Sequence, residues 1–480
     1  MTVVASFERL VLLALAAFAI VAPDSRATIG ETTCDGVAIS NVSSLRTGIA
    51  DHPPGTTFCI KAGEYRVRKP LIPKSDDTFI GAPGAVLNGS KRLHKFVHSN
   101  GSWVALKQRQ KHYDPRGVCN PLRYKGCQYG DDVFFDNKPL RRVMRLSALK
   151  PGRFYFDYAT NKIYIADNPH GHKVEAAVGS MAFKGQLTAA QDVVIRGLVV
   201  EKFATTGINA AKTWVIDGNE VRLNHGIVIH GGKVVRGNFV HDNGQIGMVG
   251  NTANGVDLLY EDNEIAFNNY AHFKNGWEAG GAKWLEERGL VVRRNYVHDN
   301  KGPGLWTDTD NVEVTYESNR VEDNTGAGIF HEASSDAVIR DNTVSGNGFK
   351  WKSWLSGAGI LISSSENVQV YGNIVSGNAD GIAITHTARR SGTSHGPRNI
   401  DVHDNTITMK LGATGMATQG SVFFTSRNNH FENNTYFLGC GDTHFAWLDP
   451  RDGVGWAYIT RSQWTAAGND TTGTFTSICA

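Results

Sequence analysis

A pair of asparagines, repeated along the middle of the chain, constrains the fold more than any other feature. Seven times an asparagine is followed by a second one five residues later: Asn219/Asn224, Asn238/Asn243, Asn263/Asn268, Asn295/Asn300, Asn319/Asn324, Asn342/Asn347 and Asn373/Asn378. A short β-branched run precedes each pair, and a glycine with alternating apolar residues usually follows it, as in GILIS and GIAIT. Short strands that recur every ~20 to 30 residues, with turns between them, are typical of a solenoid. The repeat therefore predicts an all-β chain that folds as a right-handed parallel β-helix.

The asparagines themselves are expected to be structural. Asparagine tolerates the left-handed backbone of tight turns, and its side chain can hydrogen-bond along a stack. We therefore expect the pairs to occupy the turns and to stack at the corners of successive coils, and we do not take them as ligands or catalysts. The histidines of the recurring VHDN motif, at 240–243 and 297–300, belong to the same turns.

The asparagine rhythm also divides the chain into segments. With 480 residues, 41% of them hydrophobic, the chain can fill a large core as one elongated architecture. FCIKAGEYRV (58–67) and FIGAPGAVLNG (79–89) predict first coils, whereas GRFYFDYATNKIYIAD (152–167) predicts a hairpin in a stretch without the repeat. We expect N-terminal coils over 28–95, an inserted small β-domain over 96–180, the main β-helix over 181–410 and a capping tail over 411–480.

The first residues and the cysteines predict export. Arg9 precedes the apolar run LVLLALAAFAIVA (10–22), and small residues follow. We therefore expect a signal peptide at 1–27 and a secreted protein, extracellular or periplasmic; a retained membrane anchor is the alternative. An even number of cysteines in an exported chain predicts three disulfides, which we pair as nearest neighbours among Cys34, Cys59, Cys119, Cys127, Cys440 and Cys479. The sequence contains no CxxC pair and no HExxH motif, so we expect no zinc site.

Two neighbouring repeats that end in a carboxylate indicate a candidate site. Side chains of a strand alternate between its two faces, and the isoleucines of GILIS and GIAIT mark the inward side. The same register in GLWTD (304–308) and GIFHE (328–332) turns Trp306 and Asp308 outward in one strand, and Phe330 and Glu332 outward in the next. Exposed aromatic rings beside carboxylates suit the binding of sugar rings.

Three further residues are placed by the same register. An ungapped alignment of GAKWL (281–285) with the two strands puts Lys283 in the column of Trp306 and Phe330. His331 is expected to point inward, where a hydrogen-bonded core histidine is the alternative to a role in the site. His230 is expected in the column of Asp308 and Glu332.

The spacing of the two carboxylates suggests a mechanism. Adjacent strands lie ~4.8 Å apart, so Asp308 and Glu332 should be separated by about that distance. Retaining glycosidases place their nucleophile and their acid/base about 5 to 5.5 Å apart. Two stacked like charges also raise the pKa of one carboxyl, which suits the acid. We take Asp308 and Glu332 as catalytic candidates, and as substrate-binding candidates Trp306, Phe330, Lys283, Glu278, Asp310 and His331.

Residues 35–440 resemble the β-helix glycoside hydrolases, especially the β-xylosidases and the related fucosidase/xylanase type. Those enzymes combine a parallel β-helix with a small inserted β-domain. GLWTD resembles their strand that ends in an aspartate nucleophile, GIFHE resembles the next strand with a glutamate acid/base, and GGAKW (280–284) resembles a lysine-bearing strand before them. The resemblance implies that Asp308 is the nucleophile and Glu332 the acid/base. The chain departs from the family pattern after both carboxylates, so the resemblance does not imply a particular sugar.

Three functions stay open from the sequence. The first is a retaining glycoside hydrolase that needs no cofactor. The second is a polysaccharide lyase or epimerase on uronic-acid polymers, with calcium held by Glu278, Asp308 or Asp310 and Lys283 as the base. The third is a non-catalytic glycan-binding β-helix, whose acids, Glu286 and Glu287 among them, form a solvated ladder or calcium ligands.

The expected partners follow from these functions and from the charge. A net charge of +3 without a long basic run disfavours nucleic acid as a partner. We expect a carbohydrate substrate, no nucleic acid, no membrane after signal cleavage, and a monomer.

Overall fold

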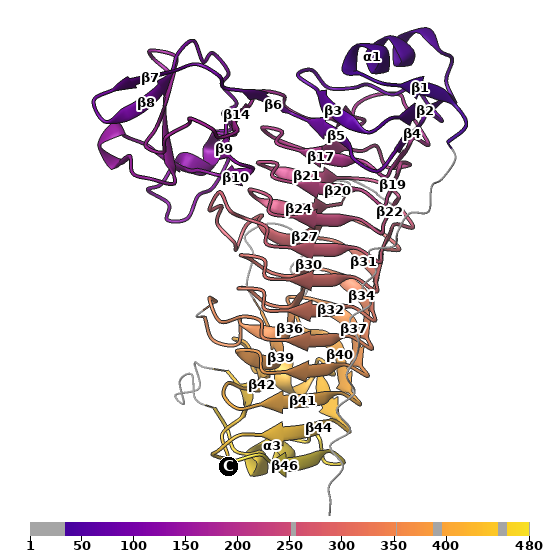
Figure 1. Ribbon diagram of the computed structural model, residues 1–480. Helices are drawn as coiled ribbons and strands as arrows, with labels where there is room; N and C mark the ends of the chain where they lie inside the picture. The colour runs from indigo at the N-terminus through magenta and orange to yellow at the C-terminus, as the bar shows by residue number, and fades with distance from the viewer. Residues whose placement is uncertain (1–33, 251–255, 352, 387–395, 450–457, 480) are drawn as a thin grey trace, which may run out of the picture. The chain divides into compact units, whose positions relative to one another are not determined.

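The computed structural model is a right-handed parallel β-helix, as the asparagine repeat predicts. It describes residues 34–250, 256–351, 353–386, 396–449 and 458–479, so the expected signal peptide lies outside the described residues. The chain divides into units 1–34 and 35–480, and the β-helix lies in the second unit. Within that unit, three long parallel sheets follow the stack of coils (Figure 1).

The strands of each sheet follow one another along the stack in chain order. Sheet A has 13 strands: β1 (Val37–Ile39), β2 (Thr57–Ile60), β4 (Thr78–Gly81), β16 (Val194–Arg196), β19 (Val215–Asp217), β22 (Val234–Arg236), β25 (Leu259–Glu261), β28 (Val291–Arg293), β31 (Val312–Glu317), β34 (Ser335–Arg340), β37 (Glu366–Tyr371), β40 (Arg398–His403) and β43 (His430–Glu432). Sheet B has 13 strands: β3 (Gly63–Arg66), β5 (Ala85–Asn88), β17 (Val199–Glu201), β20 (Glu220–Arg222), β23 (Phe239–His241), β26 (Glu264–Ala266), β29 (Tyr296–His298), β32 (Arg320–Glu322), β35 (Thr343–Ser345), β38 (Ile374–Ser376), β41 (Thr406–Met409), β44 (Thr435–Leu438) and β46 (Thr474–Ser477). Sheet C has 11 strands: β15 (Phe183–Lys184), β18 (Ile208–Asn209), β21 (Ile227–His230), β24 (Ile246–Val249), β27 (Gly280–Trp284), β30 (Leu305–Asp308), β33 (Ile329–Glu332), β36 (Ala358–Ser363), β39 (Asp380–Thr385), β42 (Thr414–Ala417) and β45 (Phe445–Leu448).

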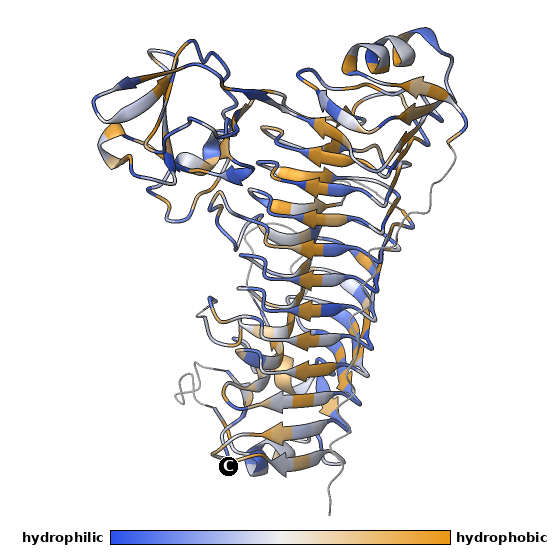
Figure 2. Cartoon of the chain, in the orientation of Figure 1, coloured by the Kyte–Doolittle hydropathy of each residue, from blue (hydrophilic) through white to orange (hydrophobic). Residues whose placement is uncertain are grey.

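Each full coil gives one strand to each sheet, so alternate side chains of every strand point into a common interior. Equivalent residues stack from coil to coil: Ile329 pairs with Ile360, which pairs with Ile382. These side chains and Leu305 belong to one continuous apolar core, which confirms the inward register predicted from the alternation. Figure 2 shows the hydrophobic residues gathered along the stacked strands, with hydrophilic residues at the turns.

The asparagines form two buried ladders at the corners on either side of sheet B. In all seven pairs both asparagines are buried. Asn300 is typical: its Nδ2 donates to Ile265 O at 2.9 Å and to Asn324 Oδ1 at 2.9 Å. Its own Oδ1 accepts the backbone N–H of Asn268 at 3.1 Å. The structural role is therefore confirmed.

The ladders differ from expectation in backbone conformation. The residue before each paired asparagine, and not the asparagine, lies in the left-handed region; Asp299 has φ 53° before Asn300, and Asp323 has φ 52° before Asn324. Asparagine is thus required for its amide, which can donate and accept along the stack, whereas the preceding residue makes the turn.

Helices close the two ends of the stack. Helix α1 (Val42–Asp51), with a capping box at Asn41, packs Leu45 and Ile49 onto the first coils. Two more helices lie near the C-terminus, α2 (Val422–Thr425) and α3 (Arg461–Ala466). Trp464 of α3 is fully buried against the core. No helix of the described residues is both long and apolar enough to cross a membrane.

The C-terminal segment 411–480 is more than the capping tail expected from the sequence. Strands β42 to β46 continue all three sheets, and Asn405 and Asn434 extend one ladder to Asp470. The disulfides Cys119–Cys127 and Cys440–Cys479 confirm two of the nearest-neighbour pairs, and Cys34 and Cys59 are also disulfide-bonded.

An inserted region with its own core leaves the coils between Asn88 and Phe183. It contains a four-stranded sheet and a five-stranded sheet, made of β10 (Lys138–Pro139), β9 (Val133–Phe135), β14 (Val174–Ala177) and β6 (Ser90–Arg92), and of β11 (Arg141–Val143), β12 (Arg153–Asp157), β13 (Lys162–Ile165), β8 (Ser102–Ala105) and β7 (Phe96–Ser99). Two 3-10 turns, η1 (Gly126–Gln128) and η2 (Leu146–Ala148), complete it. The antiparallel pair β12–β13 is the predicted hairpin, and a separate cluster around Phe154 and Ile163 forms the core.

Candidate active site

Strands β27, β30 and β33 bring the predicted residues together on the outer face of sheet C. Lys283 pairs with Trp306, and Trp306 pairs with Phe330. Asp308 pairs with Glu332. The two columns read from the sequence are therefore confirmed.

Contacts within this group connect the Lys283 ammonium, the Trp306 ring and the two carboxylates. Lys283 Nζ lies 2.8 Å from Asp308 Oδ2, and it donates to the carbonyl of Trp277 at 2.7 Å. The same ammonium lies 3.7 Å from the centroid of the Trp306 ring, a cation–π contact. Trp306 Nε1 donates to Glu332 Oε2 at 3.1 Å. Lys283 thus favours the ionised form of Asp308, and Trp306 fixes the position of Glu332.

The prediction that these side chains are exposed on the surface is wrong. Trp306 is 3% exposed, Phe330 6% and Asp308 8%. The two rings stack on each other with centroids 5.2 Å apart, and Trp351 packs edge-on against Phe330. The segment between β35 and β36, which carries Trp351 and Leu355, joins these rings in an apolar cluster outside the main core. Strand alternation predicts which way a side chain points, but not that a loop will cover it.

The other predicted residues lie in different surroundings. His331 is fully buried in the interior, 2.8 Å from Thr307 Oγ1, which does not fit the substrate contact expected for it. Asp310 is exposed at the turn after β30, with φ 51°. Glu278 is half-buried beside Lys283. His230 pairs with Val249, which pairs with Lys283, so it stands in the lysine column and not in the carboxylate column.

The acids proposed as one solvated face are also separated. Glu286 is exposed, whereas Glu287 is 1% exposed. These acids therefore do not form a continuous ladder through Glu278, Glu286, Glu287 and Asp310.

A cavity of about 680 Å³ lies next to this group, between the inserted region and the coils. The inserted region lines it with residues 111–114, Arg116, Gly117, Cys127, Gln128 and Gly130, and the coils line it with residues 204–206, 225–227, His230, Gln245, Phe273, Trp277 and Glu278. The carbonyl of Trp277 accepts from Lys283, so the cavity wall is joined directly to the Lys283–Asp308 ion pair.

Two buried histidines on the cavity wall have opposite electrostatics. Burial opposes protonation of His225, but Asp132 Oδ2 lies 2.7 Å from its Nδ1 and the Cys127 carbonyl 3.0 Å from its Nε2, so its pKa is raised. Burial lowers the pKa of His230 to about 4. His225 therefore carries positive charge more readily than His230, which stays neutral near pH 7.

Glu278 is a wall residue that lies beside Lys283 of the predicted site. Burial raises its pKa, while the charges of Lys283 and Arg116 work in the opposite direction. A carboxyl held in this way keeps a proton to higher pH than a solvated glutamate, which is the property of a general acid or of a hydrogen-bond donor to a sugar hydroxyl.

Sequence reasoning missed most of the cavity wall. His225 and Asp132 lie 93 residues apart, and Tyr270 donates to the same carboxylate from 138 residues away. No local pattern marks such a contact, because it depends on where the inserted region packs. The one available signal was the GWE sequence at 276–278, just before the lysine-bearing strand.

Comparisons with known proteins agree with this architecture. A family model for the right handed beta helix region matches residues 206–360. None of the curated proteins matches the sequence significantly. The solved structure of XylC with xylose is similar over 84% of both chains, with 13% identity and a TM-score of 0.54. The A-module of mannuronan C-5 epimerase AlgE6 from Azotobacter vinelandii has 14% identity and a TM-score of 0.47, covering 93% of this chain and 97% of its own. The chain is thus a right-handed parallel β-helix protein.

Proposed function

We propose that this chain is a secreted carbohydrate-active enzyme, a retaining glycoside hydrolase of plant or microbial polysaccharides or oligosaccharides. The observation that carries the proposal is the registered pair Asp308 and Glu332 on adjacent strands, with Lys283 bound to Asp308. Adjacent strands lie ~4.8 Å apart, close to the ~5 to 5.5 Å that separates the carboxyls of retaining enzymes. XylC, which has the same fold, is solved with xylose, so xylose-containing oligosaccharides are the first substrates to test.

The two carboxyls divide the reaction between them. Asp308, kept ionised by Lys283, attacks the anomeric carbon, and the bond to the leaving oxygen breaks as Glu332 transfers a proton to it. Glu332 then removes a proton from water, which attacks the anomeric carbon and releases Asp308. The reaction needs no cofactor in this scheme.

The cavity supplies room for the substrate in this proposal. Asp308 and Lys283 are nearly covered, so a long chain does not reach them from open solvent. The cavity volume of about 680 Å³ is within the ~300 to 1,000 Å³ typical of ligand sites. We place the sugar residues next to the cleaved bond there, against Trp277 and Glu278.

The lyase or epimerase alternative places a different demand on Lys283. A base that removes the C5 proton must be neutral before it acts. Lys283 Nζ is instead engaged by the Asp308 carboxylate, the Trp277 carbonyl and the face of the Trp306 ring. This arrangement supports the hydrolase.

One digest separates the possible functions. The protein is incubated with a panel of oligosaccharides and polysaccharides, and new reducing ends, unsaturated UV-absorbing ends and uronate configuration are measured in parallel. Hydrolysis predicts reducing ends without UV absorbance. We expect Asp308→Asn and Glu332→Gln each to lower the rate by about 10² to 10⁴-fold, and Glu313→Gln, an exposed residue outside the site, to leave it within about 2-fold.

The other outcomes are equally definite. UV-absorbing ends or inverted uronates, abolished by a calcium chelator, would move the assignment to elimination or epimerisation. Activity that survives both carboxylate substitutions would remove Asp308 and Glu332 from catalysis. Binding of glycans without any product would favour the non-catalytic function.

A further inference from the structure

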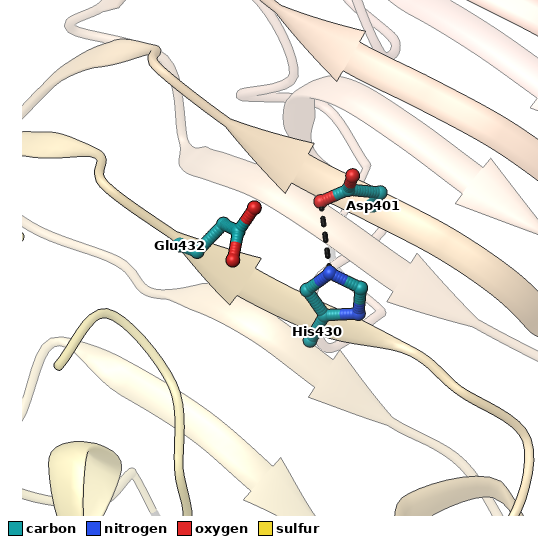
Figure 3. Close-up of side chains that lie close together, drawn as sticks. All are labelled: Asp401, His430 and Glu432. Carbon is teal, nitrogen blue, oxygen red and sulfur yellow. Dashed lines mark ion pairs between the residues drawn. The ribbon is translucent and has the colours of Figure 1, made fainter. Parts of the chain in front are cut away.

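Four side chains with metal-binding atoms lie on the outer face of sheet A near its C-terminal end. Asp401 and His403 alternate along β40, and His430 and Glu432 alternate along β43. The strands are in register, so that Asp401 pairs with His430 and His403 pairs with Glu432. The result is a two-by-two array of two imidazoles and two carboxylates, three of which Figure 3 shows side by side.

The atoms that would bind a metal converge in this array. One ligand atom from each of Asp401, His430 and Glu432 lies within 4.8 Å of the other two. His430 Nε2 is 3.1 Å from Asp401 Oδ1 (Figure 3), and His403 Nε2 is 3.9 Å from Asp401 Oδ2. Ligands bound to zinc at about 2.0 to 2.2 Å are separated from each other by roughly 3.3 to 3.6 Å in a tetrahedron. Small side-chain rotations would bring these atoms to that spacing.

The Asp401 carboxylate gives a second, independent indication. Its side chain is 20% exposed, and its Oδ1 is buried without a hydrogen bond of good geometry, although His430 Nε2 is near. A buried carboxylate oxygen whose only contact has poor hydrogen-bond geometry is incompletely satisfied, and a bound cation would satisfy it.

His403 is positioned to be a fourth ligand. Its Nδ1 lies 2.7 Å from Asp404 Oδ2, so the neutral tautomer with its proton on Nδ1 can donate to that carboxylate and present Nε2 to a metal. Nε2 now faces Gln369 Oε1 at 3.2 Å and Asp401. A carboxylate behind a ligating histidine is the usual support of such a ligand.

The array differs from the other turns with the same sequence motif. His241 and His298 have the same place in the VHDN motif, but they lie in β23 and β29 of sheet B and contact Asp242 and Asp299. Within the part of the chain that the structure describes, only Asp401, His430 and Glu432 bring three such ligands together. A general property of the asparagine turn would have produced the same set in every coil.

We propose that Asp401, His430 and Glu432, with His403 as the fourth ligand, bind one zinc ion or a similar first-row divalent ion. Two imidazoles and two carboxylates suit zinc, whereas calcium takes six to eight oxygen ligands. β43 is the last strand of sheet A, so the ion would join the final two strands of that sheet.

The site escaped the sequence analysis for a definite reason. The ligands come from DVHDN (401–405) and HFENN (430–434), which carry neither CxxC nor HExxH. Their convergence depends on strand register across 29 residues. The expectation that the chain has no zinc site, which rested on linear motifs, did not cover a site of this kind.

Titration of the metal-stripped full chain tests the proposal. After treatment with EDTA and its removal, zinc is titrated by calorimetry and cobalt by the visible absorption of a tetrahedral ion. We expect one ion per chain and a rise in the melting temperature when zinc is added. We expect His430→Gln and Asp401→Asn to weaken binding by ~100-fold or more, and His403→Gln by ~10 to 100-fold, the range seen for residues that support a metal site.

A matched substitution controls for loss of any turn histidine. His298→Gln removes the histidine of a VHDN motif on sheet B and should leave zinc affinity unchanged. If zinc does not bind below 1 mM (~10⁻³ M, about 4 kcal/mol of binding free energy), or binds His430→Gln as tightly as the parent, the proposal fails. Glycan digestion is not part of this test, so its result is independent of the proposed function.

Discussion

A fully buried histidine, His331, imposes a pH dependence on the stability of the interior. Burial lowers its pKa to about 3, and Nδ1 lies 2.8 Å from Thr307 Oγ1. Tyr316 in turn donates to Thr307 at 3.1 Å, so the hydroxyls form a short chain that ends at the imidazole. This chain of hydrogen bonds fits a neutral imidazole, because Nδ1 can accept a hydrogen bond from Thr307 while the ring remains uncharged.

The sign of the effect follows from the lowered pKa. Above pH ~6.5 the imidazole is neutral in both the folded and the unfolded chain, so proton binding does not change the stability there. Below that pH the unfolded chain binds a proton that the folded chain does not bind until about pH 3. Stability is therefore lost as pH falls, by up to ~1.4 kcal/mol per pH unit.

Replacing His331 by isoleucine should remove this loss. Ile362 occupies the next position in the same column, so the site accepts that side chain. We expect the melting temperature of His331→Ile to fall less than that of the parent between pH 6.5 and 4.5. Melting curves at several pH values, at one scan rate, measure it. The exposed His94→Gln should behave like the parent, and an unchanged slope in His331→Ile would contradict the explanation.

The residues of the candidate site could be predicted to different degrees. Strand alternation was sufficient to place Asp308 and Glu332 in one column, because a period of two leaves only one register that buries the isoleucines. It could not place Glu278 or His225, whose surroundings depend on chain far away in sequence. Nor could it predict the burial of Trp306, which depends on how a loop folds back.

At the scale of the element, the ladder acts as a continuous hydrogen-bonded unit. Each amide donates to the coil before and to the coil after, as Asn300 does to Ile265 O and Asn324 Oδ1. The sequence predicted the ladder but assigned the left-handed turn to the wrong residue. Asparagine is common at left-handed positions for local reasons, whereas here the stacking bonds fix its position and Asp299 makes the turn.

Interrupting the ladder should be costly. Asn300→Ala leaves the Asn268 N–H and the Ile265 carbonyl without their partner. Each buried group that loses its hydrogen-bond partner costs about 1 to 3 kcal/mol. We therefore expect the free energy of unfolding to fall by about 3 kcal/mol or more. Asn300→Asp retains the acceptor for Asn268 but turns a buried carboxylate oxygen toward the Ile265 carbonyl and Asn324 Oδ1, so it should lose at least as much. Urea unfolding measures both, with Asn168→Ala, an exposed turn asparagine, as the control expected to change little.

At the scale of the whole molecule, buried polar contacts and two small apolar clusters, one around Phe273 and one around Phe134, hold the coils and the inserted region together. Lys202 Nζ lies 2.7 Å from Glu175, and both groups are buried. The Asp132 carboxylate contacts the His225 imidazole and accepts a hydrogen bond from the Tyr270 hydroxyl, and these two residues lie in different coils. The sequence predicted that residues near 96–180 would leave the repeat, but charge pairs between distant segments carry no local signal, so the cavity they enclose was not foreseeable.

The Cys119–Cys127 and Cys440–Cys479 disulfides should each stabilise their own part of the molecule independently. In a solenoid each coil contacts mainly its neighbours, so a local constraint has a local effect. Cys119–Cys127 closes a separation of 8 residues on the cavity wall, and Cys440–Cys479 closes one of 39 near the last coils. By loop entropy they contribute about 2 to 3 and about 4 kcal/mol respectively.

Hydrogen exchange on two double variants tests this independence. Cys119→Ser/Cys127→Ser should speed exchange in residues 111–130, because that segment loses its crosslink while the ladder amides keep their bonds. Cys440→Ser/Cys479→Ser should speed exchange in residues 435–449 and leave 111–130 unchanged. Each variant serves as the control for the other. Faster exchange in both segments, 111–130 and 435–449, in either variant would mean that the coils unfold as one cooperative unit. The inserted region would then have no stability separate from the β-helix that carries it.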